Sequence, residues 1–416
     1  MKDATIRRWE SRAVPLGEAF DLLAAYRPPL GAFFERRGSG VAGMSGSALV
    51  NDGPVPLDPS QVIHALRDAV RSGHDIAPVA LGAYRFRPAA RPLSGLVIPR
   101  RTVRRDHGGP TWQMDASDGG ATESPPQWEP VVGGTAHDPF AEIQLGAIPP
   151  ADSYEDAVRE AVTRIRRGEM RKVVLARTIE VSADHTLDPR LLAHRLRAVD
   201  PEAYTFATPT DEGVLVGASP ELLVSRRGLE VRSNPLAGSA PRSGDPDEDR
   251  ANADGLVSSA KDREEHAIVV DAVAETLRPF CVELTWDLEP VLRETPNIWH
   301  LSTRFRGVLK EPAASALDLV AELHPTPAVA GTPRDTALET IAELESFDRG
   351  RYAGPVGWVD ADGDGEWAIA LRCAELRGDR ATLYAGAGIV ADSDPARELD
   401  ETERKFRAFL DALRWG

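Results

Sequence analysis

Short extended runs alternate with helical stretches over the C-terminal two thirds of the chain. Apolar residues at helical spacing predict one helix that begins at Ser153, a long helix over 249–277, and a last helix that begins at Pro395 behind an Asp394 N-cap. The length of 416 residues allows two or three domains and equally one large α/β or α+β unit. The runs that predict strands are 172–181, 214–218, 221–231 with a turn at Arg227-Gly228, 366–376 and 381–390.

The segment 106–138 interrupts this pattern. It is rich in Gly, Pro, Ser and Thr and shows little apolar periodicity, so we predict a long, flexible surface loop or linker there. The N-terminal part, 1–138, ends with this loop. The C-terminal part, 139–416, carries most of the motifs considered below.

The composition of the 416 residues narrows the class of protein. Hydrophobic residues make up 42% and charged residues 27%, which is typical of a globular chain. A net charge of −16 argues against a nucleic-acid-binding face. The two cysteines are too few for a disulfide framework and form no CxxC pair. The chain starts without an apolar signal segment and has no apolar window long enough to span a membrane, so we expect a cytoplasmic protein without membrane contact.

Two familiar motifs are incomplete in this chain. Gly386-Ala387-Gly388 resembles part of a dinucleotide-binding fingerprint, but the helix and second strand that the fingerprint requires do not follow. The acidic segment 360–365 resembles half of a calcium loop, but Leu371 occupies the position of the bidentate glutamate. We therefore predict a hairpin turn between Trp358 and Trp367.

Carboxylates gather on two predicted helices. In the long helix Glu265 shares an apolar stripe and should point inward, whereas Glu264 should face water. In the last helix Glu398, Glu401 and Lys405 follow one line, which by itself indicates a solvated face with an i,i+4 ion pair. Together with Glu265, however, these carboxylates form the kind of hard-oxygen site that suits Mg²⁺.

The C-terminal part contains several ordered motifs, which are Arg171-Lys172-Val173-Val174-Leu175-Ala176-Arg177, Gly217-Ala218-Ser219-Pro220-Glu221, Asn234-Pro235-Leu236-Ala237-Gly238-Ser239-Ala240, Lys261-Asp262-Arg263 with Glu265-His266, His324-Pro325-Thr326-Pro327-Ala328, Tyr352-Ala353-Gly354-Pro355-Val356-Gly357 and Gly386-Ala387-Gly388. Together these motifs resemble those of the chorismate-utilising enzymes, and most of all the isochorismate synthases of the siderophore (2,3-dihydroxybenzoate) type. The N-terminal part resembles the family more loosely, through Phe33-Phe34-Glu35-Arg36 and Leu81-Gly82-Ala83-Tyr84.

The resemblance implies one integrated α+β domain, in which helices surround two antiparallel sheets and the active site lies in the cleft between them. It also implies a Mg²⁺-dependent isomerisation of chorismate to isochorismate, by water addition at C2 and loss of the C4 hydroxyl. Water is a poor nucleophile and hydroxide a poor leaving group, so this chemistry needs a general base and a general acid. By resemblance, Lys172 is the base and Glu221 the acid.

The resemblance further assigns the residues that bind substrate and metal. Glu265 and Glu401 would hold Mg²⁺, with Glu398 nearby or acting through water. His300 and His324 are interpreted as hydrogen-bonded core residues without a catalytic role. The substrate-binding residues are Gly238, Ser239, Tyr352, Arg372, Gly386, Gly388 and Lys405.

Other activities of the same family are alternatives. Salicylate synthases usually have threonine where this chain has Ala328, and menaquinone-pathway isochorismate synthases usually differ around Leu236-Ala237-Gly238-Ser239. Amine-using relatives lack lysine at the position of Lys172. A non-catalytic metal-binding scaffold is the alternative from another class. We expect a monomer with chorismate as its small-molecule partner and downstream pathway enzymes as candidate protein partners.

Overall fold

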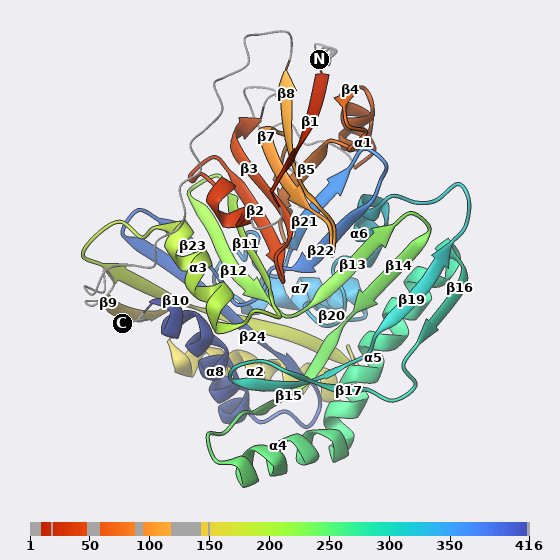
Figure 1. Ribbon diagram of the computed structural model, residues 1–416. Helices are drawn as coiled ribbons and strands as arrows, with labels where there is room; N and C mark the ends of the chain where they lie inside the picture. The colour runs from red at the N-terminus through yellow and green to blue at the C-terminus, as the bar shows by residue number, and fades with distance from the viewer. Residues whose placement is uncertain are drawn as a thin grey trace, which may run out of the picture.

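The computed structural model of the protein describes residues 10–17, 20–47, 59–87, 95–117, 143–148 and 150–413. Within these residues it is an α+β structure with three sheets, here called A, B and C (Figure 1). All strand pairs recorded there are antiparallel except β1 with β4, which run parallel. The small sheet C, beside A and B, is an addition to the two sheets that the sequence predicts.

Sheet A contains, in spatial order among the described residues, β20 (Gly331–Thr332), β10 (Lys172–Ala183), β24 (Arg380–Ile389), β23 (Cys373–Arg377), β12 (Val214–Ser219), β11 (Tyr204–Pro209), β2 (Ala32–Arg36), β3 (Ser39–Ser47), β7 (Pro99–Arg105), β8 (Thr111–Ser117), β1 (Glu10–Leu16) and β4 (Val70–Gly73), and β9 (Ile143–Ile148) also pairs with β10. Sheet B contains β16 (Cys281–Trp286), β19 (Phe305–Leu309), β14 (Glu230–Asn234), β13 (Leu222–Arg227), β22 (Gly365–Ile369), β21 (Pro355–Asp360), β5 (Val79–Ala83) and β6 (Leu96–Val97). Sheet C contains β15 (Leu236–Pro241), β18 (Ile298–Ser302) and β17 (Val291–Glu294).

Helices cover the sheets and carry part of the site. In Figure 1 the N-terminal strands lie at the top, and α2, α4, α5 and α8 lie along the lower side. The helices are α1 (Pro59–Arg67), α2 (Ala151–Arg166), α3 (Pro189–Val199), α4 (Pro246–Ser258), α5 (Ala260–Leu277), α6 (Ala316–Leu323), α7 (Arg334–Leu344) and α8 (Pro395–Leu413), with short 3-10 turns η1 (Leu22–Ala25) and η2 (Arg278–Phe280).

Strands from both parts of the chain pair within the same sheets. In sheet A, β2 pairs with β11, and the rings of Phe34 and Tyr204 stack with centroids 5.5 Å apart. In sheet B, β5 pairs with β21 and brings Gly82 opposite Gly357. The N-terminal strands therefore extend the sheets that carry the C-terminal motifs.

The last helix packs on sheet A through its apolar stripe. Phe406 and Phe409 are buried and share a core with Leu192 of α3 and Leu383 of β24. Burying each phenylalanine contributes about 1.5–3 kcal/mol. Asp394 accepts a hydrogen bond from the Arg397 amide at 3.0 Å, which confirms the predicted N-terminal cap. The stripe fixes which side of α8 faces the site.

Two predictions about helices are wrong in detail. The long helix over 249–277 is two helices, because the chain leaves helical geometry at Ser259, whose hydroxyl then caps α5 by accepting from the Asp262 amide at 3.2 Å. The helix predicted to begin at Ser153 begins at Ala151, behind Pro150 and without a side-chain cap.

Two predictions about extended segments also need correction. The strand over 366–376 is divided into β22 and β23, because Arg372 adopts a left-handed conformation with φ 50°. The loop predicted over 106–138 does not begin at 106, since Thr111–Ser117 is strand β8, with Met114 buried. The rest of that segment, 118–138, lies outside the described residues. The turns at Arg227-Gly228 and between Trp358 and Trp367 are confirmed.

None of the helices within the described residues combines the length and the apolar character that crossing a membrane requires.

Candidate active site

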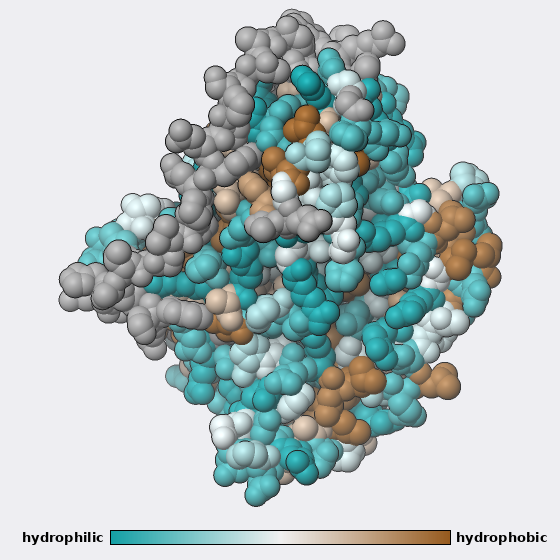
Figure 2. Space-filling model, viewed as in Figure 1, coloured by the Kyte–Doolittle hydropathy of each residue, from teal (hydrophilic) through white to brown (hydrophobic). Residues whose placement is uncertain are grey.

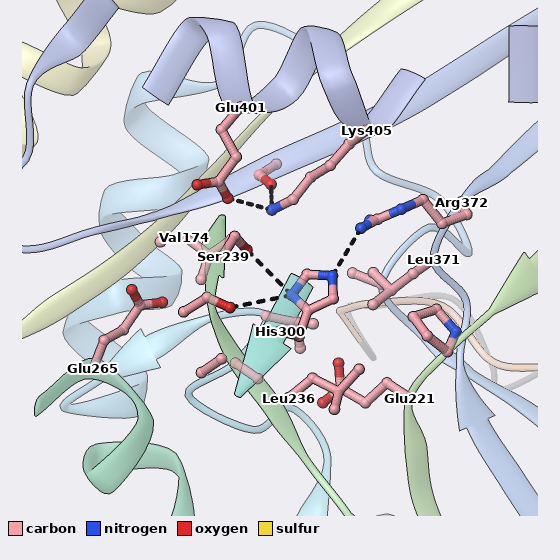
Figure 3. Close-up of a pocket in the computed structure, with 18 of the residues that line it drawn as sticks. Val174, Glu221, Leu236, Ser239, Glu265, His300, Leu371, Arg372, Glu401 and Lys405 are labelled. Atoms are coloured by element: carbon pink, nitrogen blue, oxygen red, sulfur yellow. Dashed lines mark hydrogen bonds and ion pairs between the residues drawn. The ribbon is translucent and has the colours of Figure 1, made fainter. Parts of the chain in front are cut away.

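One pocket gathers nearly all the predicted site residues, from sheets A and C, helices α5 and α8, and the segments that connect strands (Figure 3). Lys172 and Glu398 are the two that do not line it. The predicted residues in its lining are Glu221, Gly238, Ser239, Glu265, Tyr352, Arg372, Gly386, Gly388, Glu401 and Lys405. Lining residues that sequence reasoning did not assign to the site include Val174, Leu236, His300, Val329, Arg349 and Leu371.

Lys172 is buried at the start of β10, behind the carboxylate of Glu265. Its Nζ lies 2.9 Å from Glu265 Oε1, in an ion pair that lacks hydrogen-bond angles. Helix α5 supplies Glu265 as its inward carboxylate, while Glu264 is exposed, so the predicted helix phase is confirmed. The predicted base therefore lies behind the pocket lining, in contact with a predicted metal ligand that does line it.

Gly388 makes room for this ion pair. It lies on β24 opposite Val174 of β10. A Cβ at Gly388 would be 2.3 Å from Glu265 Oε1 and 3.0 Å from Lys172 Cε. The structure therefore gives Gly388 a steric role, in addition to the backbone contacts with substrate that its position in the pocket allows.

Glu221 is buried at the junction of β12 and β13, where the chain passes from sheet A to sheet B. Burial raises the pKa of its carboxyl to about 7, although the Leu236 amide and the charges of Lys172 and Arg372 act in the opposite direction. A carboxyl that still carries its proton near neutral pH can act as a general acid. The structure thus gives Glu221 the property that its predicted role requires.

Helix α8 brings a second carboxylate and a lysine to the pocket. Lys405 Nζ donates to Glu401 Oε1 at 2.5 Å and to the carbonyl of Gly386 at 2.7 Å. Glu398 lies outside the lining, and its Oε1 accepts from Lys261 Nζ of α5 at 3.0 Å. Burial and the neighbouring Glu401 raise the pKa of Glu398 to about 7, against the effect of Lys261. Glu398 is therefore buried, not on the solvated face that the helix pattern alone indicates.

His300 of β18 reaches the pocket, although sequence reasoning gave it no role. Burial and the nearby Arg372 hold the pKa of His300 well below its usual value. Its neutral ring accepts from Arg372 Nη2 at 3.2 Å through Nε2, so Nδ1 carries the proton and can donate to the carbonyl of Gly238 at 3.2 Å. Ser239 Oγ lies 3.2 Å from the same Nδ1. His300 thereby orients Arg372 toward the pocket.

His324 lies away from this network. Its Nε2 bonds the carbonyl of Phe86 at 3.0 Å, and burial lowers the pKa of its ring to about 4. This geometry agrees with the predicted core role.

The buried ion pair between Arg349 and Glu345 supports the pocket wall at Val174 of β10. Arg349 donates to Glu345 at 2.9 Å through Nε and to the carbonyl of Val174 at 2.7 Å through Nη2. Glu345 in turn accepts from the Ala176 amide at 2.8 Å. These side chains complete the edge of β10 between the stretches paired with β20 and β9. The Arg349 guanidinium also lies 5.9 Å from the Tyr352 ring, so one pair joins β10 to the segment that carries Tyr352.

Carboxylates of two helices provide donors that fit a divalent cation. Glu265 and Glu401 both line the pocket, and the absence of a side chain at Gly388 gives the Glu265 carboxylate the room to do so. Among the described residues no three His, Cys, Asp or Glu side chains gather as a ready metal cluster. Mg²⁺ commonly takes only one or two protein carboxylates together with substrate oxygens and water, so the donor set suits this ion.

The pocket combines a buried glutamic acid that has a raised pKa with cationic side chains and carboxylates, and a buried lysine lies directly behind its lining. Such a site suits an enzyme that acts on a small organic anion. The chain belongs to the chorismate binding enzyme family, whose model matches residues 135–414.

Named relatives share most of the chain. It is 43% identical over 362 residues to isochorismate synthase DhbC of Bacillus subtilis, covering 85% of each protein. It is 44% identical over 365 residues to a putative isochorismate synthase, MenF, of Mycobacterium tuberculosis, covering 84% of this chain and 90% of that protein. A crystal structure of a putative 2,3-dihydroxybenzoate-specific isochorismate synthase, DhbC from Bacillus anthracis, aligns with a TM-score of 0.81 and 37% identity, covering 95% of this chain and 99% of that one.

Proposed function

We propose that the protein is an isochorismate synthase, which adds water to C2 of chorismate and releases the hydroxyl group from C4. The observation that carries this proposal is that Glu221, whose buried carboxyl has a pKa raised to about 7, lines the pocket, while the buried Lys172 lies directly behind the lining beside Glu265. Lys172 would take a proton from the attacking water, and Glu221 would give a proton to the departing hydroxyl group. The raised pKa of Glu221 fits the acid step near neutral pH, and the base step requires Lys172 in its neutral form.

The remaining lining residues fit a dianionic substrate. Arg372, oriented by His300, presents a planar fork of N–H donors that suits a carboxylate. Burial raises the pKa of Tyr352, so its hydroxyl keeps its proton and can donate to the same group. Lys405 and the backbone at Gly386 lie on the side of the pocket formed by α8. We propose that Arg372 and Tyr352 hold the enolpyruvyl carboxylate.

We further propose that the enzyme depends on Mg²⁺, which Glu265 and Glu401 would hold. When bound, the ion supplies positive charge to a substrate carboxylate that lies among protein carboxylates. Glu398, which pairs with Lys261, would act behind these two ligands.

The product distinguishes the activities of the family. Ala328 lines the pocket and offers no hydroxyl group at the position where salicylate synthases usually have threonine. We therefore expect isochorismate to accumulate without pyruvate. Chromatography of the purified protein incubated with chorismate, with and without Mg²⁺, tests this, with pyruvate assayed in parallel. Stoichiometric salicylate and pyruvate would replace the proposal with a salicylate synthase, and intact chorismate in both conditions would favour a non-catalytic scaffold.

We place the reaction in siderophore synthesis, because the similar solved structure carries the name of a 2,3-dihydroxybenzoate-specific enzyme. Deletion of the gene in its host should abolish catechol siderophore production. Loss of menaquinone with siderophore production intact would instead assign the menaquinone pathway.

A further inference from the structure

A second cavity adjoins the active-site pocket and shares Pro220 and Arg372 with it. The exposed Pro296 and the partly exposed Arg404 reach the surface at its rim. Arg372 forms a wall common to both cavities. The second cavity, called the entry cavity below, therefore connects the surface to the arginine that would hold a substrate carboxylate. The entry cavity is lined by Leu196, Val199, Asp200, Ala218, Pro220, Thr295, Pro296, Asn297, Ile298, Arg372 and Arg404.

Helix α8 contributes to both cavities with neighbouring residues. Lys405 lines the active-site pocket, and Arg404 lines the entry cavity. Arg404 forms an i,i+4 ion pair with Asp400, and their side chains are 26% and 58% exposed. Since both lie toward solvent and neither lines the active-site pocket, their charges can be changed without altering the proposed chemistry.

The charge of the whole protein makes such a path necessary for an anion. With a net charge of −16, the protein repels a dianion at long range, so local cations must offset this repulsion. The charged residues that line the entry cavity are Arg372, Arg404 and Asp200. Two cations thus follow one another from the rim to the shared wall, and Asp200 and Asp400 partly offset them.

We propose that the entry cavity is the route by which the dianionic substrate reaches the active-site pocket, with Arg404 as the first cation it meets and Arg372 as the second. This inference rests on the proposed function, because chorismate supplies the two carboxylates. The apolar walls of the entry cavity at Leu196, Val199 and Ile298 give the uncharged part of the substrate a path without competing polar partners.

Charge changes of opposite sign at the rim should act in opposite directions. Arg404→Gln should lower kcat/KM for chorismate about two- to fivefold at low ionic strength, and Asp400→Asn should raise it by a similar factor. Both variants should leave kcat unchanged. The changes in kcat/KM should fade near about 0.5 M salt, where screening shortens the reach of charge to a few ångströms.

A surface ion pair that lines neither cavity provides the matched control. Arg304 pairs with Asp287 at 2.8 Å, so Arg304→Gln and Asp287→Asn make the same changes in net charge elsewhere. These two variants should keep the wild-type kcat/KM. Equal effects in both pairs would show that net charge alone matters and would overturn the entry route.

The association rate constant of chorismate, measured by stopped-flow fluorescence on the same proteins, separates the inference from the proposed function. An active wild type whose kcat/KM and salt dependence are unchanged by Arg404→Gln and Asp400→Asn would overturn the entry route alone. An inactive wild type would contradict the isomerase, while the association rate constants would still test the route. If Arg404→Gln does not fold, Asp400→Asn carries the test, and an unchanged association rate constant would overturn the route.

Discussion

Gly388→Ala tests the local geometry most sharply, because one methyl group is placed against both the predicted base and a predicted metal ligand. The added Cβ would lie 2.3 Å from Glu265 Oε1 and 3.0 Å from Lys172 Cε. A relaxed carbon–oxygen contact is about 3.4 Å, so the carboxylate must retreat by about 1 Å. The backbone of Gly388 does not have a positive φ, so alanine brings a steric conflict without backbone strain.

Losses of activity and of stability are both expected. A displacement of about 1 Å at a reacting group can cost about 10²-fold in rate. Overpacking a buried position typically costs about 1–3 kcal/mol of unfolding free energy. Steady-state kinetics with chorismate and chemical denaturation would measure the two effects separately.

Gly255→Ala serves as the control, since its Cβ would meet no atom within 4 Å on α4. That variant should keep full activity. Combining Gly388→Ala with Glu265→Asp should be less harmful than the product of the two single effects, because aspartate withdraws the carboxylate from the methyl group. Wild-type kinetics for Gly388→Ala would refute the assigned steric role.

Three further predictions concern the acid–base pair and the metal. Lys172→Ala and Glu221→Gln should each lower turnover by about 10²- to 10⁴-fold in folded protein, and near-normal turnover in either variant would remove that residue from its role. Because folding raises the pKa of Glu221 from 4.5 to about 7, the folded state binds a proton that the unfolded state releases, so wild-type stability should fall as pH rises through that window. Glu221→Gln should lack this fall and gain about 3 kcal/mol relative to the wild type by about pH 8 in denaturant titrations, whereas parallel pH profiles would contradict the buried acid. Calorimetric titration with Mg²⁺ in the presence of chorismate should show weaker binding for Glu265→Ala and Glu401→Ala but not for Glu264→Ala, and equal losses at Glu264 and Glu265 would refute the assigned ligands.

Local periodicity predicts the site residues whose orientation follows from a single element. The helix period places Glu265 inward and Glu264 outward, and the structure agrees. The run of apolar residues after Lys172 likewise predicts strand β10, and Asp394 before Pro395 predicts the capped start of α8. The side toward which a residue points within one helix or strand depends on its neighbours in the sequence, so the sequence alone predicts it.

Features that depend on contacts between distant segments were missed. The pattern of its helix alone places Glu398 on a solvated face, but Lys261, which is 137 positions away, pairs with it. His300 lies among apolar residues as a core residue would, and only the pairing of β15 with β18 brings it beside Ser239. The break at Arg372 leaves no mark in the alternation of its strand, although the φ of 50° helps to direct that side chain into the pocket.

The central claim is that solvent water attacks C2 while the C4 hydroxyl leaves, and labelled water tests it most directly. The reaction is run in water enriched in oxygen-18, and the isochorismate is analysed by mass spectrometry and by the isotope shift of its C2 carbon resonance. The account predicts one heavy oxygen, attached to C2, in isochorismate formed by the wild-type protein with Mg²⁺. Isochorismate formed without the label would contradict it, because the hydroxyl would then have moved within the substrate and Lys172 would have no water to activate.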